Sequence, residues 1–89
     1  MTSDAAPADS EIGATVQRIR ALLARAEDRA QDLDRRAEAA AEAEREARRL
    51  TRAVVGLWRA SEGPTWAAVG EAVGTTKQSA HERYGRATP

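Results

Sequence analysis

Residues 65–84, TWAAVGEAVGTTKQSAHERY, decide the fold of this chain, because they predict two short helices joined by a tight turn. Gly74 can adopt the positive φ that ends a helix without a Cβ penalty. Gly70 lets the second helix approach the first closely. Thr76 can accept a hydrogen bond from the free N–H groups that begin the next helix. This order of residues is the pattern of a helix-turn-helix.

The second helix is expected to carry its polar side chains at its exposed N-terminal end, which meets base edges in a DNA-reading helix-turn-helix. Gln suits the N6 and N7 atoms of adenine, and Lys suits guanine or phosphate. The N-terminus of the first of these two helices, at Thr65, can also bind a phosphate. The alternatives are a solvated polar surface and, for Arg83, an ion pair within the domain. The candidate DNA contacts are Thr65, Thr76, Lys77, Gln78, His81, Arg83 and Arg86.

Residues 66–84 resemble the helix-turn-helix of small actinobacterial DNA-binding proteins, which are related in style to the DNA-reading half of sigma-factor region 4. The anchors of that pattern are Trp66, Gly74, Gln78, Ala80 and Tyr84, and all are present. The resemblance implies DNA binding through the second helix. Trp66 is expected to be a core residue rather than a base stacker, because folds that read duplex DNA bury it.

The composition places the core at the C-terminal end of the chain. A chain of 89 residues allows one small domain, or one small domain plus an extension. Its aromatic residues, Trp58, Trp66 and Tyr84, all lie in the C-terminal half. The rest is rich in Ala, Arg and Glu, which is typical of a long helix.

A single long helix is predicted over residues 11–60, where proline is absent and glycine occurs only near the two ends. We expect a disordered tail at 1–10, a coiled-coil helix at 11–49 and a helix-turn-helix domain at 50–89. Apolar residues recur in alternating steps of three and four, which indicates a heptad seam for a homodimer. The direction of pairing stays open, with a slight preference for antiparallel, and a lone solvated helix is the alternative. The seam runs through Ile12, Val16, Ile19, Leu23, Ala26, Ala30, Leu33, Ala37, Ala40, Glu44, Ala47, Thr51, Val54 and Trp58, where Glu44 and Thr51 are polar interruptions.

The same helix is expected to supply the first of three helices in the C-terminal domain. Its apolar face widens near Leu50, Val54, Leu57 and Trp58, and Gly63 with Pro64 then ends it. A β-wing is not expected, since only GRATP follows Tyr84. The predicted core of the other two helices consists of Trp66, Val69, Val73, Ala80 and Tyr84.

The net charge of zero conceals an asymmetry between the two halves. Residues 1–44 hold 6 Arg against 10 Asp and Glu, a net charge of −4, whereas residues 45–89 hold 8 Lys and Arg against 4 Glu, a net charge of +4. The positive half contains the helix-turn-helix pattern. Attraction to DNA phosphates requires this sign.

Several function classes are disfavoured by the residues present. The chain has no Cys and one His, so neither a disulfide framework nor a metal site is expected. No nucleophile lies beside a candidate base, and no Gly-rich phosphate loop follows a strand, so we expect no enzyme and no cofactor. No apolar run could span a membrane, and MTSDAAPADS lacks the order of a signal peptide. A cytoplasmic, nucleoid-associated protein is expected.

The sequence therefore predicts an all-α protein, with a long N-terminal coiled-coil helix leading into a three-helix helix-turn-helix domain without a wing. The expected function is sequence-specific binding of double-stranded DNA by a small dimeric transcriptional regulator, which reads the major groove with residues 76–84. The alternative is a structural or adaptor coiled-coil protein, acting in partner binding or in nucleoid, plasmid or phage maintenance, with weak or no specific DNA binding.

Overall fold

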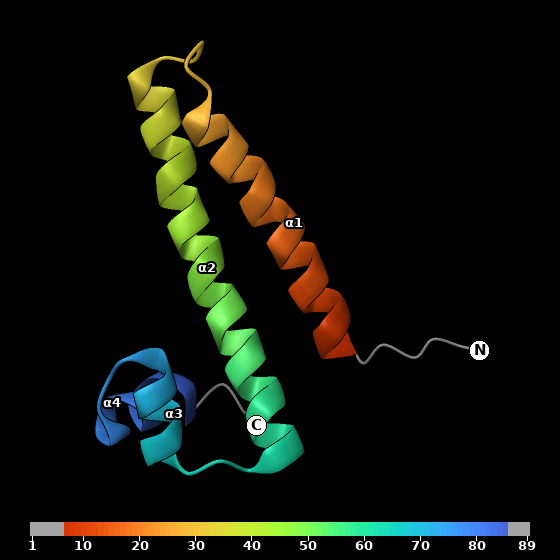
Figure 1. Cartoon of the computed structure of the whole chain (residues 1–89), viewed down its shortest axis with the longest axis vertical. Coiled ribbons are helices and arrows are strands. Elements are labelled where there is room, and N and C mark those ends of the chain that lie inside the picture. The colour runs from red at the N-terminus through yellow and green to blue at the C-terminus, as the bar shows by residue number, and fades with distance from the viewer. Residues whose placement is uncertain (1–6, 86–89) are drawn as a thin grey trace, which may run out of the picture. The chain divides into compact units, whose positions relative to one another are not determined.

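The computed structural model describes residues 7–85, and this part of the chain is all-α, as predicted. It contains α1 (Pro7–Glu27), α2 (Leu33–Glu62), α3 (Trp66–Val73) and α4 (Lys77–Tyr84), and residues 7–85 include no strand (Figure 1). None of these described helices combines the length and apolar character needed to cross a bilayer. The chain divides into two compact units, Met1–Thr51 and Arg52–Pro89, and α2 contributes to both.

Two expectations about the N-terminal half need correction. Helix α1 begins at Pro7, so residues 7–10 of the predicted tail are helical, while residues 1–6 lie outside the described part. The predicted uninterrupted helix over residues 11–60 is also wrong, because the helix stops at Glu27 and restarts at Leu33. The first 51 residues therefore contain a helical hairpin where a single rod was expected.

Aspartates hold this break without any glycine or proline. The Asp28 Oδ1 accepts a hydrogen bond from the Ala30 N–H at 3.0 Å. The Asp28 carbonyl accepts another from the Gln31 N–H at 3.1 Å, and the Asp32 carbonyl starts α2 by accepting from the Arg36 N–H at 3.0 Å. Short polar side chains of this kind compete with the helical hydrogen bonds of the backbone. The Asp-rich stretch DRAQDLD is therefore the helix breaker.

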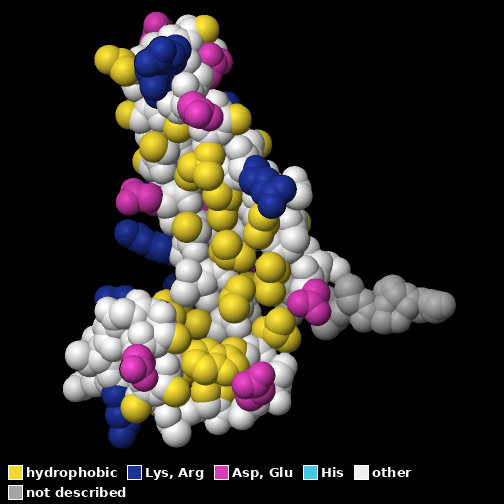
Figure 2. Space-filling model, viewed as in Figure 1, with side chains coloured by type: hydrophobic (Ala, Val, Ile, Leu, Met, Phe, Trp, Pro, Cys, Tyr) yellow, Lys and Arg dark blue, Asp and Glu magenta, His cyan; other side chains and the backbone are white. Residues whose placement is uncertain are grey.

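Side chains from both helices connect the two arms of the hairpin. The Arg36 Nε donates to the Ala26 carbonyl at 2.9 Å, which satisfies one of the free carbonyls at the end of α1. Farther along, the Arg18 Nε donates to the Glu46 Oε1 at 3.1 Å. Figure 2 shows apolar side chains along this hairpin. Its buried residues are Thr15 and Leu22 in α1 and Ala39 and Ala43 in α2.

The predicted seam is displaced on α2. The positions expected there, including Ala37, Ala40 and Glu44, are exposed, whereas Ala39 and Ala43 are buried. A shift of one residue rotates a helix face by about 100°. The loop at residues 28–32 resets the helical phase, so a heptad counted through it does not select the face of α2 that packs within the hairpin.

The residues expected to mediate dimerisation are only partly covered by the hairpin. Ile12, Val16 and Ile19 are half-buried within it. Leu23 is 53% exposed and Leu33 is 76% exposed. The hairpin thus uses one side of the apolar stripe of α1 and leaves the other side open.

Neighbouring alanines test this register. Ala39→Leu should destabilise the hairpin by about 1–3 kcal/mol, because extra methylenes do not fit a close-packed site. Ala40→Leu should have an effect within about 0.5 kcal/mol, since Ala40 is exposed and Leu is a good helix former. Urea unfolding of both variants gives the comparison. A larger loss for Ala40→Leu would support the heptad register predicted from the sequence.

The C-terminal unit has a three-helix core, to which α3 and α4 contribute the predicted residues and α2 contributes them only in part. Val69 and Ala80 are fully buried, and Val55 completes the buried cluster. Val55 takes the place expected for Val54, which is 45% exposed. The predicted Leu57 is half-buried outside this cluster, and the predicted Leu50 belongs to the other unit. Gly63 adopts a φ of 60° after the end of α2, as expected for the turn. The half-buried residues around this cluster are Trp58, Trp66, Val73 and Tyr84.

Candidate nucleic-acid interface

The turn between α3 and α4 is as tight as the glycines predicted. Gly74 is left-handed, with φ 81° and ψ 33°, and the Thr75 N–H donates to the Gly70 carbonyl at 2.8 Å. A Cβ at Gly70 would lie 2.8 Å from the carbonyl oxygens of both Thr75 and Thr76. These are backbone atoms within the turn and cannot rotate away. Gly70 is therefore required for α4 to start where it does.

Threonines cap both short helices. The Thr65 hydroxyl accepts from the Ala68 N–H at 3.1 Å, and the Thr76 hydroxyl accepts from the Ser79 N–H at 3.1 Å. Both caps have the extended backbone typical of an N-cap. The first turns of α3 and α4 contain no acidic residue, unlike those of α1 and α2. The positive ends of both helix dipoles are therefore not neutralised locally.

Helix α4 presents one side to the core and the rest to solvent. Ala80 is fully buried and Tyr84 packs against the core cluster. Of the predicted DNA contacts, Arg86 lies outside the described residues. The other predicted contacts are all exposed, namely Thr65, Thr76, Lys77, Gln78, His81 and Arg83.

The structure brings some of these predicted contacts together and separates another. Lys77, Gln78 and His81 line a common pocket with Trp66. Arg83 follows Gln78 by five positions, about 140° around the helix axis, so it projects from a different side. Among the described residues Arg83 has no ion pair.

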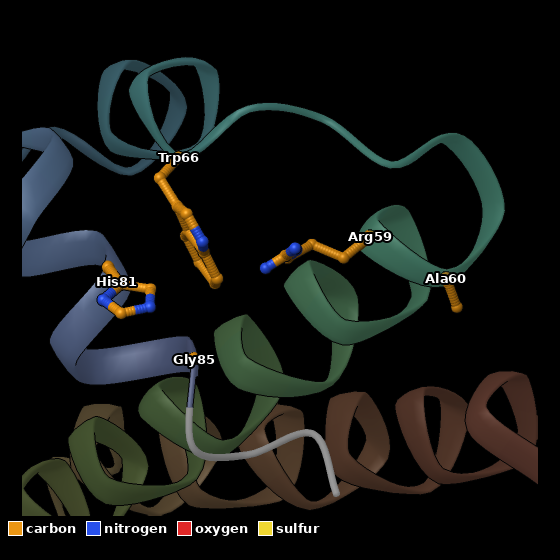
Figure 3. Close-up of a pocket in the computed structure, with 5 residues that line it drawn as sticks. All are labelled: Arg59, Ala60, Trp66, His81 and Gly85. Carbon is orange, nitrogen blue, oxygen red and sulfur yellow. The ribbon is translucent and has the colours of Figure 1, made fainter.

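Trp66 lies between a cation and an imidazole. The Arg59 guanidinium carbon lies 3.7 Å from the centroid of the Trp66 ring, which is a cation–π contact. The His81 ring approaches the indole edge-on, with centroids 5.1 Å apart and planes at 73° (Figure 3). A pocket of about 350 Å³ opens beside them, and it is lined by Arg59, Ala60, Trp66, His81 and Gly85.

Sequence reasoning missed two residues of this region. Arg59 was not expected to contact Trp66, and its Nε is buried with no hydrogen-bond partner among the described residues. Glu82 is exposed and follows Gln78 by four positions, so both lie on one side of α4. The spacing of Glu82 was available in the sequence. The contact of Arg59 was not, because it depends on how α2 packs against α3.

A second pocket, of about 490 Å³, lies where α3 begins beside the first turns of α4. Its lining consists of Trp66 from α3 and Lys77, Gln78 and His81 from α4. The indole supplies an apolar wall, and the methylenes of the Lys77 side chain can extend it. Residues 7–85 contain no cluster of three or more His, Cys, Asp or Glu side chains arranged for a metal ion.

Comparisons of the chain with family models, with curated proteins and with solved structures found no match. The function is therefore inferred from the geometry and charge of the site.

Proposed function

We propose that this protein binds double-stranded DNA without enzymatic activity, and that α4 reads the major groove as part of a small transcriptional regulator in the cytoplasm. The observation that carries the proposal is the start of α4. The turn before α4 leaves no room for a Cβ at Gly70, and the Thr76 side chain caps the helix. Lys77 and Gln78 follow this cap and are both exposed in the first helical turn. A fixed helix N-terminus with a cation and an amide suits both phosphates and base edges.

Charge around α4 supports phosphate binding with one exception. The first turns of α3 and α4 lack acidic residues, and Lys77 and Arg83 are exposed. Glu82 opposes them, because a carboxylate near phosphates is repelled. In the major groove a carboxylate can accept a hydrogen bond from cytosine N4. Glu82 would therefore lower the affinity for DNA of any sequence and favour sites with a cytosine at that position.

Two variants of α4, each removing one charge, test this proposal because they should change DNA affinity in opposite directions. Lys77→Gln should weaken binding to a random duplex, and Glu82→Gln should strengthen it, each by about 1 kcal/mol or less at low salt. Fluorescence anisotropy with a labelled duplex measures both. Arg29→Gln, which removes an exposed charge from the other unit, controls for net charge. Unchanged affinity in both α4 variants would show that α4 does not approach the phosphates.

We further propose that two copies of the chain associate through the side of α1 that the hairpin leaves open. Leu23 is 53% exposed there, on the same face of α1 as the half-buried Ile12 and Val16. Two linked readers would gain affinity from effective concentration. Leu23→Asp should then reduce the mass in solution from dimer to monomer and weaken DNA binding. A wild-type monomer would contradict this, and the exposed leucines would then favour the adaptor function, with a different protein docking on them.

A further inference from the structure

We propose that the pocket between Trp66 and the first turns of α4 receives the 5-methyl group of a thymine, next to an adenine read by Gln78. This inference rests on the proposed function and specifies part of its target. The pocket of about 490 Å³ is lined by Trp66, Lys77, Gln78 and His81. The methyl group would belong to a T·A base pair and would enter the pocket from the major groove of duplex DNA.

The chemistry of the lining selects this occupant. The major groove carries one apolar group, the thymine methyl, and all its other recognition features are hydrogen-bond donors or acceptors. Trp66 offers an apolar wall, while the charge of Lys77 and the amide of Gln78 lie at the same pocket. A cation beside an apolar wall complements a methyl group bordered by anionic phosphates.

The position of Gln78 limits which thymine is involved. Its amide can hold adenine N6 and N7 in a bidentate contact, which fixes α4 against one A·T pair. Stacked bases follow each other by about 3.4 Å along a strand. Because Gln78 also lines the pocket, the methyl group that enters it should come from a directly adjacent base pair.

Trp66 is contacted on one side by Arg59, which lies outside the pocket, and at its edge by His81, which lines the pocket. The Arg59 guanidinium lies 3.7 Å from the indole centroid, and the His81 ring meets the indole at 73°. Arg59 lines the smaller pocket of about 350 Å³, whereas Lys77 and Gln78 line only the larger one. The apolar wall is thus supported by Arg59 from α2 as well as by His81 from α4.

The test uses the full chain and a duplex selected by it from a random pool. Each thymine of that duplex is replaced in turn by uracil, which removes only the methyl group. One position, adjacent to the adenine that Gln78→Ala identifies, should lose about fourfold in affinity, as expected for one buried methyl group. Trp66→Phe should reduce this difference, whereas Trp58→Phe, a matched change in the same core outside the pocket, should preserve it.

The outcomes separate this inference from the proposed function. Specific binding with equal affinity for thymine and uracil at every position would overturn the inference and leave DNA binding intact. Absence of duplex binding would overturn both. If Trp66→Phe fails to fold in a thermal melt, Lys77→Ala replaces it, because Lys77 is exposed and lines the same pocket. The uracil scan of the wild-type protein decides the matter even without a variant.

Discussion

Gly70→Ala is expected to disrupt the C-terminal unit. The new Cβ would lie 2.8 Å from two backbone carbonyl oxygens of the turn, a separation that real Cβ atoms essentially never show. Overpacking typically costs about 1–3 kcal/mol, and here the opposing atoms are backbone, so we expect the upper end of that range or more. For a chain of this size the melting temperature should fall by roughly 10–20 °C. Circular dichroism during heating measures the loss.

Gly56→Ala is the matched control and should act in the opposite direction. Gly56 lies within α2, and a Cβ there meets nothing within 4 Å. Alanine in a helix interior is favoured over glycine by about 0.5–1 kcal/mol, so this variant should melt higher than the wild type. Equal stability of the Gly70→Ala and Gly56→Ala proteins would show that the turn does not close as tightly as described.

Gln78→Ala is expected to cost about 1–3 kcal/mol on a selected DNA site and little on random DNA. Under the proposed function, the variant would lose a bidentate base contact and keep every phosphate contact. Gln78 is exposed, so the fold should be unaffected. Competition binding with both duplexes measures the ratio of affinities.

Arg83→Ala provides the contrast for Gln78→Ala. Arg83 is exposed on a different side of α4, where it suits the phosphate backbone, and its removal should weaken binding to both duplexes alike. If Gln78→Ala also lowered both affinities equally, α4 would be a phosphate-binding helix without base reading.

The C-terminal unit was largely predictable because its signals are local. Gly74 and Gly63 adopt positive φ, and Thr65 and Thr76 cap helices, as these residue types favour. Each of these features depends on the backbone within a few residues. The core positions on α3 and α4 also followed from helical spacing, whereas on α2 Val55 replaces Val54 and Leu57 stays outside the cluster.

The N-terminal hairpin was not predicted, because its signals compete with stronger ones. High helix propensity surrounds residues 28–32, and the break depends on Asp28 turning back to the Ala30 N–H. Once the chain turns, Ala39 replaces Ala40 at the packed face. Long-range contacts such as Arg18 with Glu46 follow from that turn and could not be read before it was known.

The contact of Arg59 with Trp66 escaped prediction for a related reason. Its partners belong to different helices, and the pairing depends on the packing of α2 against α3. The spacing of residues within one helix does not predict a contact between two helices. The pocket beside α4 likewise exists only once α3 and α4 are packed together.

The most direct measurement of DNA binding is the affinity of the full chain for duplex DNA as a function of salt concentration. Each neutralised phosphate contributes about −0.9 to the slope of log K against log salt, so a few contacts should give a slope between about −2 and −4. Lys77→Gln should make the slope shallower by about one. A slope of zero, or no binding at low salt, would contradict the proposal that α4 docks against the DNA backbone.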